Sequence, residues 1–411
     1  MNSRERVWAA LSHEEGDRVP VDFGAMPSTG IMAMAYGELR RYLGYGKGRV
    51  RVYDFSQQLA EPEPEILERF GVDVVDLRNT SILPDNRKWI PWTLPDGQEA
   101  ERPADVLAES DGCGGHIIKD SLGQVIARMP KGSFYFTGLQ PALGEPPKPL
   151  EEYTFSILED DYLEMLQTRA QWFRKNTEYA VMAGFGGSIL ELCQGHRGWG
   201  NFMMDLAADP EFAEALMDKA LESHLRNLER FLEAVGDTID VIQMGDDLGT
   251  QQGPQLSPEM YHEMIYPRHK QVYQYVHARS KAAVFLHSCG GIRPLLPDLI
   301  DAGVQALNPV QTSAAGMDPA ELKAQYGNRL TFWGGGCDTQ AILPLGTPEQ
   351  IDAHVRERIS IFAPGGGFVF CQVHNVQAKT PPRNVVAMFE AVAKYRDYPD
   401  GWKREDLRVA Q

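Results

Sequence analysis

Three side chains with metal-binding donor atoms stand out in this sequence, namely His287, Cys289 and Cys337. His287 and Cys289 are two residues apart at the end of a β-prone run, so on an extended strand both side chains point to the same side. Cys337 ends a later β-prone run, directly after three glycines. Imidazole nitrogen and thiolate sulfur suit Zn²⁺, and three protein ligands leave a fourth position open, as in catalytic sites. A cysteine is also often a small buried hydrophobe, so the zinc hypothesis depends on the two runs meeting in the fold.

Other polar residues and one aromatic residue follow the remaining β-prone runs. Asp246 and Asp247 cannot both point into a pocket from one strand. We expect one of them to act as an acid–base group, a substrate anchor or a ligand, and a helix-capping or loop role for both is the alternative. The candidate catalytic residues are therefore Asp246, Asp247 and His374; the candidate substrate-binding residues are Asp22, Phe185, Gln311 and Asn375; and Glu191 is the candidate fourth zinc ligand.

Eight β-prone runs, most of them followed by a helical pattern, are expected to place these residues. The later runs are almost entirely apolar, as expected for parallel strands buried on both faces. Eight such units predict a (β/α)8 barrel, whose catalytic residues lie at the C-terminal ends of its strands. An open doubly wound sheet is the rival, but no G-x-G-x-x-G turn follows an early strand. The eight runs are 18–24, 72–77, 179–187, 239–247, 281–291, 306–311, 330–338 and 366–377.

The chain as a whole, residues 1–411, is expected to form a single barrel domain with two additions. Apolar residues at helical spacing predict a short helix over residues 2–13, before the first strand. Residues 80–150 contain short β-prone pieces separated by Gly, Pro and Asp-Gly turns. This composition predicts an antiparallel β-rich insertion within the barrel.

The charge and the cysteine content exclude several classes of protein. The net charge is −17, from 57 acidic and 40 basic side chains, so nucleic acid and anionic membranes are poor partners. The five cysteines form no dense framework, and no signal peptide or apolar stretch of membrane-spanning length is evident. We therefore expect a cytoplasmic protein.

Several segments resemble the uroporphyrinogen decarboxylase superfamily, and within it the cobalamin-linked methyltransferases. The segments that carry the likeness are 245–270, 285–311, 331–340 and 363–377. The resemblance implies a (β/α)8 barrel, and in the methyltransferase branch a His-x-Cys pair with a distant Cys binds zinc. Those positions are His287, Cys289 and Cys337 here. The decarboxylases themselves carry an N-terminal Arg motif that holds substrate carboxylates, whereas the comparable residues 22–32 contain no arginine.

The resemblance implies an O-demethylase type of methyltransferase that works with the corrinoid of a separate carrier protein. The small substrate is either a methyl ether, such as a methoxylated aromatic, or a thiol that accepts the methyl group. Two alternatives remain open: a metal-free decarboxylase-like lyase, and a non-catalytic barrel that binds a corrinoid carrier. A homodimer is common in the family, although no residue establishes one here.

Overall fold

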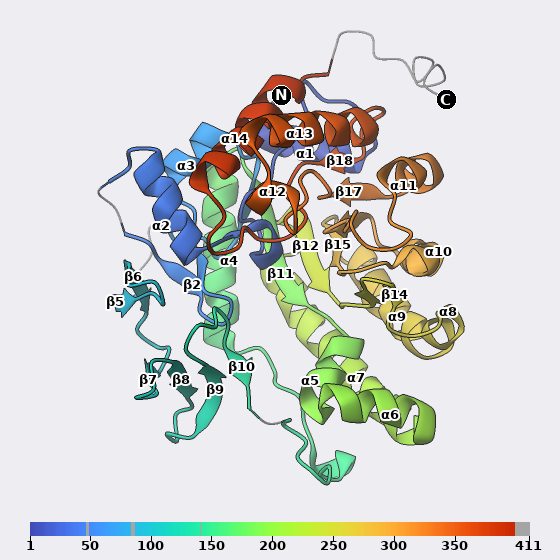
Figure 1. The fold of residues 1–411 in the computed structure, drawn as a ribbon. Helices are drawn as coiled ribbons and strands as arrows, with labels where there is room; N and C mark the ends of the chain where they lie inside the picture. The colour runs from blue at the N-terminus through green and yellow to red at the C-terminus, as the bar shows by residue number, and fades with distance from the viewer. Residues whose placement is uncertain (47–48, 84–86, 140, 399–411) are drawn as a thin grey trace.

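The computed structural model of this chain describes residues 1–411 except 47–48, 84–86, 140 and 399–411. Its centre is a parallel sheet of seven strands (Figure 1). The strands are β4 (Val74–Asp76), β11 (Ala180–Gly186), β12 (Val241–Gly245), β15 (Ala283–His287), β16 (Ala306–Asn308), β17 (Thr331–Trp333) and β18 (Phe368–Val369). Their spatial order, β4-β11-β12-β15-β16-β17-β18, follows the order in the sequence, as it does when βα units wind in one direction.

The two edges of this sheet are joined by the segment predicted as the first strand. Val21 forms a parallel bridge with Phe370, and Asp22 forms one with Val74. The Asp22 N–H donates to the Phe370 carbonyl oxygen at 2.9 Å, and the Asp73 N–H donates to that of Val21 at 2.8 Å. These bonds close the sheet into a ring, so the predicted (β/α)8 barrel is confirmed, with its first strand reduced to a few paired residues.

Helices surround the barrel and follow its strands (Figure 1). Most begin with a proline in the first turn, where a missing N–H costs nothing. α13 also has a capping box formed by Thr347 and Gln350. The helices are α2 (Ala33–Tyr42), α3 (Pro64–Phe70), α4 (Asp160–Asn176), α5 (Leu190–Arg197), α6 (Trp199–Ala208), α7 (Pro210–Val235), α8 (Pro258–Met260), α9 (Tyr266–His277), α10 (Leu296–Ala302), α11 (Pro319–Tyr326), α12 (Ile342–Leu345), α13 (Pro348–Phe362) and α14 (Pro382–Tyr395), with a π-helical turn at Tyr261–Ile265.

Side chains on the strands alternate between the barrel interior and the helix layer. On β15, Ala283 and Phe285 pack in the interior cluster. Val284 and Leu286 pack in the larger cluster between the sheet and the helices. Because the period of a strand is two, the residues that extend each strand keep these directions. This alternation decides which residues at the strand ends can face one another.

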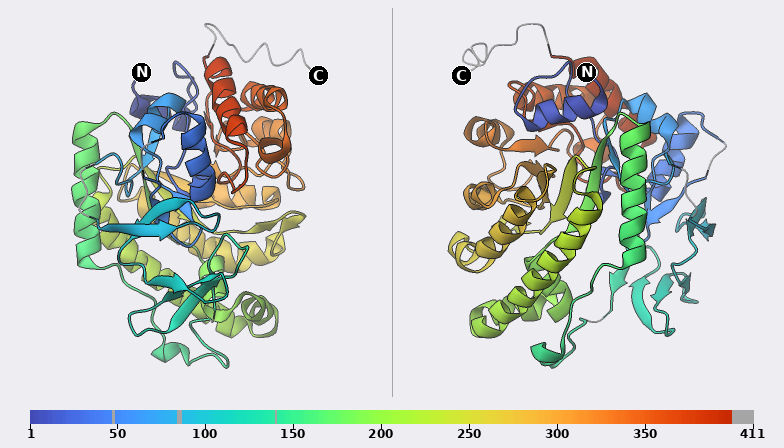
Figure 2. Two further views of the ribbon diagram at one scale, coloured as in Figure 1. Left: turned by 60° about the vertical axis from the view of Figure 1, so that its left-hand side comes forward. Right: turned by 180° about the vertical axis from the view of Figure 1, so that it is seen from behind.

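The N-terminal helix α1 (Ser3–Leu11) lies across the N-terminal end of the barrel (Figure 2). It begins with a capping box in which Asn2 and Glu5 bond each other's backbone N–H groups. Val7, Ala10 and Leu11 belong to the same apolar cluster as the barrel interior. The helix therefore plugs this end, and the strands finish at the opposite end. We call that end the barrel mouth.

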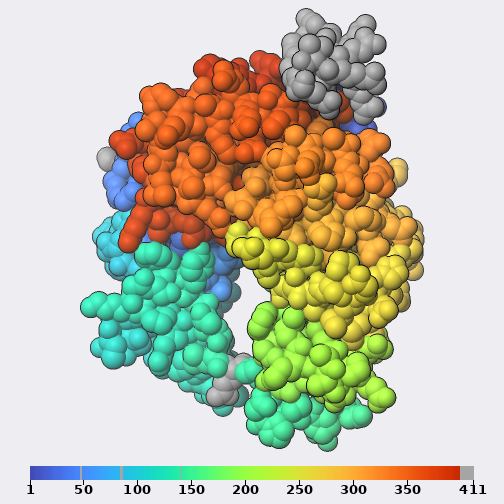
Figure 3. Space-filling model, turned by 45° about the vertical axis from the view of Figure 1, so that its right-hand side comes forward, coloured from blue at the N-terminus to red at the C-terminus, as the bar shows by residue number. Residues whose placement is uncertain are grey.

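The predicted β-rich insertion is confirmed and lies beside the mouth (Figures 1 and 2). It contains one antiparallel pair and one antiparallel four-stranded sheet. Figure 3 shows a deep hollow between the insertion, α5–α6 and the region around α8. The pair is β5 (Trp89–Thr93) and β6 (Glu99–Pro103), and the sheet is β7 (Ala108–Ser110), β8 (His116–Lys119), β9 (Val125–Met129) and β10 (Thr137–Gly138).

Two smaller sheets complete the structure. A three-stranded antiparallel sheet precedes β4, and a short hairpin follows β12. Within the described residues, no helix is both long enough and apolar enough to cross a membrane. The strands of the two sheets are β1 (Ile31–Met32), β2 (Val52–Asp54) and β3 (Leu59–Ala60), then β13 (Gly249–Thr250) and β14 (Gly253–Pro254).

Candidate active site

Asp247, His287 and Cys289 meet at the barrel mouth, at the ends of β12 and β15. One donor atom from each lies within 4.8 Å of the other two. The Cys289 Sγ is 3.5 Å from the His287 Nε2, which is 3.6 Å from the Asp247 Oδ1. Gly245 pairs with His287 across the two strands, so the interior-facing Asp247 comes level with Cys289. Its Oδ1 accepts the Cys289 N–H at 2.8 Å, which fixes the loop that carries the thiol.

The imidazole of His287 is held with its Nε2 toward this group. Its Nδ1 lies 2.6 Å from the Asn308 Oδ1, and the Asn308 Nδ2 donates to the Trp333 carbonyl oxygen at 2.8 Å. Because the amide nitrogen is used on Trp333, the Oδ1 must accept, so the proton of neutral His287 is on Nδ1. The Nε2 lone pair is then free for a cation, the arrangement usual for metal-binding histidines. Asn308 ends β16 and is fully buried.

The donor set of this group fits zinc. Thiolate sulfur, imidazole nitrogen and carboxylate oxygen are all zinc ligands, and three of them leave room for a substrate. Burial raises the pKa of the Cys289 thiol, and the Asp247 carboxylate raises it further. A bound cation reverses this balance, because it stabilises the thiolate directly. The three side chains are therefore better placed to bind a cation than to remain together without one.

Cys337, the third zinc ligand predicted from the sequence, lies outside this group among the described residues. It follows β17 after a turn in which Gly334 and Gly335 have positive φ angles of 129° and 70°. Its side chain is fully buried in the cluster between sheet and helices, with Sγ 3.9 Å from the Asp338 carbonyl oxygen. The turn interrupts the strand alternation on which the sequence argument depended.

Asp246 points away from the mouth, into the helix layer. Its carboxylate accepts the N–H groups of Ile189, Leu190 and Glu191 at 2.8–2.9 Å, which caps the start of α5. His269 Nε2 contacts the same carboxylate at 2.9 Å, and both side chains are fully buried. The alternation along β12 explains this placement, since Met244 faces the helices and Asp246 is two residues later. The acid–base role expected for Asp246 is therefore corrected to the capping role, and Asp247 is the one that faces the mouth.

Phe185 is a second candidate that the structure places on the helix side. Its ring contacts Phe231 and His224 of α7, with centroid distances of 5.4 and 6.0 Å. It shares this face of β11 with Val181 and Ala183. The predicted substrate contact is corrected for this residue, because the interior positions of β11 are the even-numbered ones.

Gln311 and the neighbours His374 and Asn375 all lie at the strand ends, but they differ in what they contact. The Gln311 Oε1 accepts the Gly290 N–H at 2.8 Å, so it supports the loop after Cys289. The His374 ring centroid is 6.5 Å from that of His287. Burial, and then the nearby His287, lowers the pKa of His374, which keeps its imidazole neutral near pH 7. Asn375 is fully buried and donates to the Gln57 Oε1 at 3.2 Å.

Asp22 and Glu191 have raised pKa values for different reasons. Asp22 is fully buried, where it accepts the N–H of Ala25 and the Trp333 Nε1–H at 3.0 and 2.8 Å. Burial raises its pKa to about 7. Glu191 is exposed at the start of α5, but the protein atoms around its carboxyl group, and then Asp247 and Asp246, raise its pKa to about 7. Glu191 thus borders the three-residue group without belonging to it.

The structure adds residues that the sequence argument did not select. Asn308 was visible as a polar strand end, but its bond to His287 needed the register of β15 against β16. Asp76 and Arg78 stand at the end of β4, where the same search for polar strand ends would have found them. His269 lies on a helix, and nothing in its local sequence indicates a partner at Asp246.

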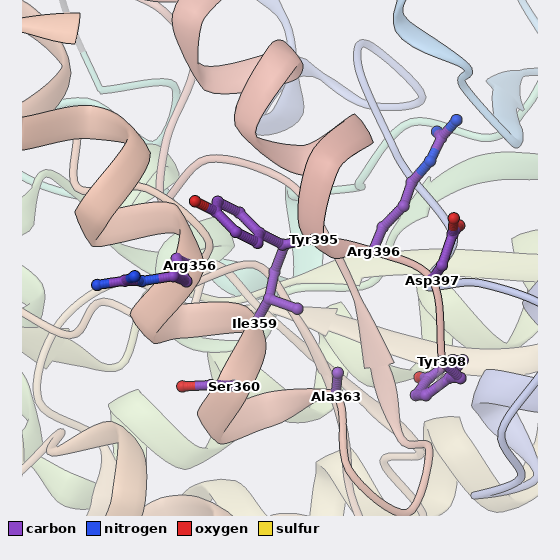
Figure 4. A pocket seen from close by; sticks show the side chains of 8 residues that line it. All are labelled: Arg356, Ile359, Ser360, Ala363, Tyr395, Arg396, Asp397 and Tyr398. Atoms are coloured by element: carbon purple, nitrogen blue, oxygen red, sulfur yellow. The ribbon is translucent and has the colours of Figure 1, made fainter. Parts of the chain in front are cut away.

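A separate pocket lies between α13 and the segment that follows α14 (Figure 4). Ile359, Ala363 and the aromatic rings of Tyr395 and Tyr398 give it a largely apolar lining. It contains none of the residues at the barrel mouth, so the chemistry of the strand ends does not extend to it.

A family model and one solved structure agree with this architecture. The family model described as Uroporphyrinogen decarboxylase (URO-D) matches residues 138–395. A methyltransferase from Methanosarcina mazei matches with a TM-score of 0.59 and 19% identity, over 96% of this chain and 99% of that one. A candidate vitamin-B12-independent methionine synthase from Listeria monocytogenes matches with a TM-score of 0.36 and 14% identity, over 58% of this chain and 69% of that one. The comparison with curated proteins gave no match.

Proposed function

Because the chain belongs to the uroporphyrinogen decarboxylase family, we propose that it is a zinc-dependent methyltransferase that acts with a corrinoid carrier protein. It would move a methyl group between that corrinoid and a small methyl ether or thiol. The observation that carries the proposal is the sulfur, nitrogen and oxygen donor set at the barrel mouth. The likeness in fold to the Methanosarcina mazei methyltransferase agrees with it. The hollow in Figure 3 leaves the mouth accessible to a carrier protein.

Zinc bound by these donors would supply a Lewis acid that stabilises negative charge on the oxygen or sulfur that exchanges the methyl group. The chain itself provides orientation and a proton. Asp247 holds the Cys289 loop through its backbone N–H, and Asn308 fixes the His287 ring. A reduced corrinoid on the carrier protein would supply the acceptor for the methyl group, and the oxygen left with the electron pair of the broken carbon–oxygen bond would need one proton. We assign neutral His374 to relay that proton from solvent to the oxygen, accepting one proton as it gives up another.

Two residues are candidates for the third protein ligand of the zinc. Asp247 already lies with His287 and Cys289, whereas Cys337 is the residue that the family resemblance implies. A carboxylate leaves the metal a stronger acid than a second thiolate does, which favours the methyl-ether substrate; a second thiolate favours the thiol. The ligand set and the direction of transfer are therefore linked.

Metal analysis of the purified protein beside single variants tests the proposal. We expect about one zinc per chain in the wild type and far less in His287→Ala and Cys289→Ser. If Asp247 is the third ligand, Asp247→Asn loses zinc and Cys337→Ser keeps it, and the reverse holds if Cys337 is the ligand. Arg226→Gln, on the exposed face of α7, is a control that keeps its zinc.

Activity supplies the second readout. Methoxylated aromatics mixed with a reduced corrinoid should be demethylated by the wild type, and chelation or Cys289→Ser should abolish turnover. A zinc-free protein whose activity survives chelation would establish the metal-free lyase instead. Binding of a corrinoid carrier that is unchanged in a His287→Ala, Cys289→Ser double variant, without any turnover in the wild type, would favour the non-catalytic barrel.

A further inference from the structure

Arg78 presents its guanidinium to the barrel mouth from the end of β4. Val74 packs in the barrel interior, so Asp76 and Arg78 share its face of the strand. The Asp76 carboxylate accepts from the Arg78 Nε at 3.1 Å and from its Nη2 at 2.8 Å. This pair uses one edge of the guanidinium and fixes its plane. Its Nη1 has no partner among the described residues, and the side chain is 37% exposed.

The neighbouring strands leave this guanidinium open to the interior. Gly184 on β11 pairs with Gln243 on β12. A Cβ on Gly184 would lie 3.1 Å from the Gln243 Oε1 and 3.6 Å from the Arg78 Nη2. Any side chain at position 184 would therefore stand between Arg78 and the centre of the mouth. The glycine therefore keeps the space between Gln243 and Arg78 free of a side chain.

A cavity beside Arg78 has the lining of an oxyanion site. It is bordered by three arginines, two tyrosines, one methionine and one aspartate, and the Tyr53 hydroxyl is buried with no hydrogen-bond partner among the described residues. A buried hydroxyl without a partner is costly, so a ligand that bonds it is favoured. Arginine matches a carboxylate with two parallel N–H bonds, which makes that group the best-fitting ligand. The lining residues are Tyr53, Arg78, Arg87, Asp105, Tyr162, Met165 and Arg169, and the Asp105 Oδ1 lies 3.7 Å from the Arg87 Nη2.

We propose that Arg78 and Tyr53 bind a carboxylate of the substrate, opposite the group formed by Asp247, His287 and Cys289. This inference rests on the proposed function and narrows its substrate to small carboxylic acids that carry the methyl ether or thiol at the other end. The strands of Arg78 and His287 are three steps apart, which is about 14 Å at the backbone. Both side chains project inward and shorten that gap to the length of a single-ring molecule.

Calorimetric titration with 4-methoxybenzoate and with neutral methoxybenzene separates the carboxylate from the rest of the ligand. In Arg78→Gln, methoxybenzoate should bind at least tenfold more weakly, because the variant loses a charge-assisted hydrogen bond to the carboxylate. Binding of methoxybenzene should not change. Tyr53→Phe should weaken methoxybenzoate severalfold, and Arg226→Gln should change neither ligand. A 3-mercaptopropionate and propanethiol pair repeats the comparison for a thiol substrate.

Zinc content is measured on the same samples, which separates this inference from the proposed function. Loss of carboxylate binding in Arg78→Gln supports the inference even in a protein that holds no zinc. Equal losses for the acid and the neutral compound, no loss for either, or no binding of the acid to the wild type would each overturn it. If Arg78→Gln does not fold, the same comparison of acid and neutral ligand is made with Arg78→Lys and Tyr53→Phe, and weaker binding of the acid alone supports the inference.

Discussion

Asp73 at the closed end of the barrel and Asp247 at the mouth differ in how many fixed partners surround the carboxylate. At the closed end, Asp73 accepts bonds from Ser3, Arg6, Arg18 and the Val21 N–H, all at 2.6–2.9 Å. At the mouth, Asp247 has one close protein donor, the Cys289 N–H, and His287 is 3.6 Å away. A carboxylate that is saturated with partners contributes to stability, whereas one that is not can bind something else.

Asp240, which lies two strands away from Asp73, is surrounded by fixed partners in the same way. It is 2% exposed and accepts bonds from the Arg4 Nε, the Trp8 Nε1 and the Val181 N–H at 3.3, 2.8 and 2.9 Å. Both Asp73 and Asp240 precede strands, and both tie α1 to the barrel. The closed end is thus held by charged bonds between segments far apart in the chain. We expect changes there to alter stability, and changes at the mouth to alter binding.

The largest expected effect is the loss of Asp73 at the closed end. Asp73→Ala leaves two guanidinium groups short of their shared partner, and removal of one member of a buried ion pair costs about 3–5 kcal/mol. Urea unfolding should show this loss, while zinc content below the transition stays unchanged. Asp17→Ala removes a more exposed partner of Arg6 and should cost less than about 1 kcal/mol. Equal costs for the two variants would contradict the contrast between the ends.

A smaller effect on the free energy of unfolding is expected when the pH is changed, because the pKa of Asp22 is raised in the folded protein. Burial raises its folded pKa from 3.8 to about 7, so between these values the native state binds more protons than the unfolded state. The free energy of unfolding should therefore fall as pH rises, by about 3 kcal/mol between pH 5 and pH 8 at 1.36 kcal/mol per pKa unit. Glu61, whose pKa burial also raises to about 7, acts in the same direction.

Comparison with Asp22→Asn isolates the share of Asp22 in this slope. Unfolding is measured in urea at both pH values. The variant should lose most of the dependence on pH while Glu61 keeps its part. An unchanged slope would show that the carboxyl group of Asp22 is not held neutral by burial.

The smallest of the three effects concerns Asn308, which orients a ligand without touching the metal. Asn308→Ala removes the acceptor on the His287 Nδ1 and should weaken zinc binding about 10–100-fold, measured by competition with a chromogenic chelator. Asn375→Ala is the matched control, since that amide bonds Gln57 instead of a member of the metal group. Equal affinity in Asn308→Ala and the wild type would mean that the His287 ring is positioned by packing alone.

Much of this organisation was predictable because it depends on short-range pattern. Apolar runs of strand length between helical patterns gave the eight units, and the search for polar strand ends found Asp247, His287 and Cys289. The predictions for Asp246 and Phe185 were wrong because both side chains point from their strands into the helix layer and not into the barrel mouth. Every second residue of a strand faces the barrel interior, so the face of each side chain follows once one interior residue is known. Where both alternating sets of residues are apolar, the sequence does not show which set faces the interior.

The sequence by itself determined the (β/α)8 barrel, its β-rich insertion and the presence of ligand-type residues at the strand ends, because periodicity and turn residues act locally. Only the tertiary structure decided which of those residues meet. The register of β12 against β15 brings Asp247 to His287, and a glycine turn after β17 directs Cys337 elsewhere. Hydrogen bonds between segments far apart in the chain set these relations, and no local pattern encodes them.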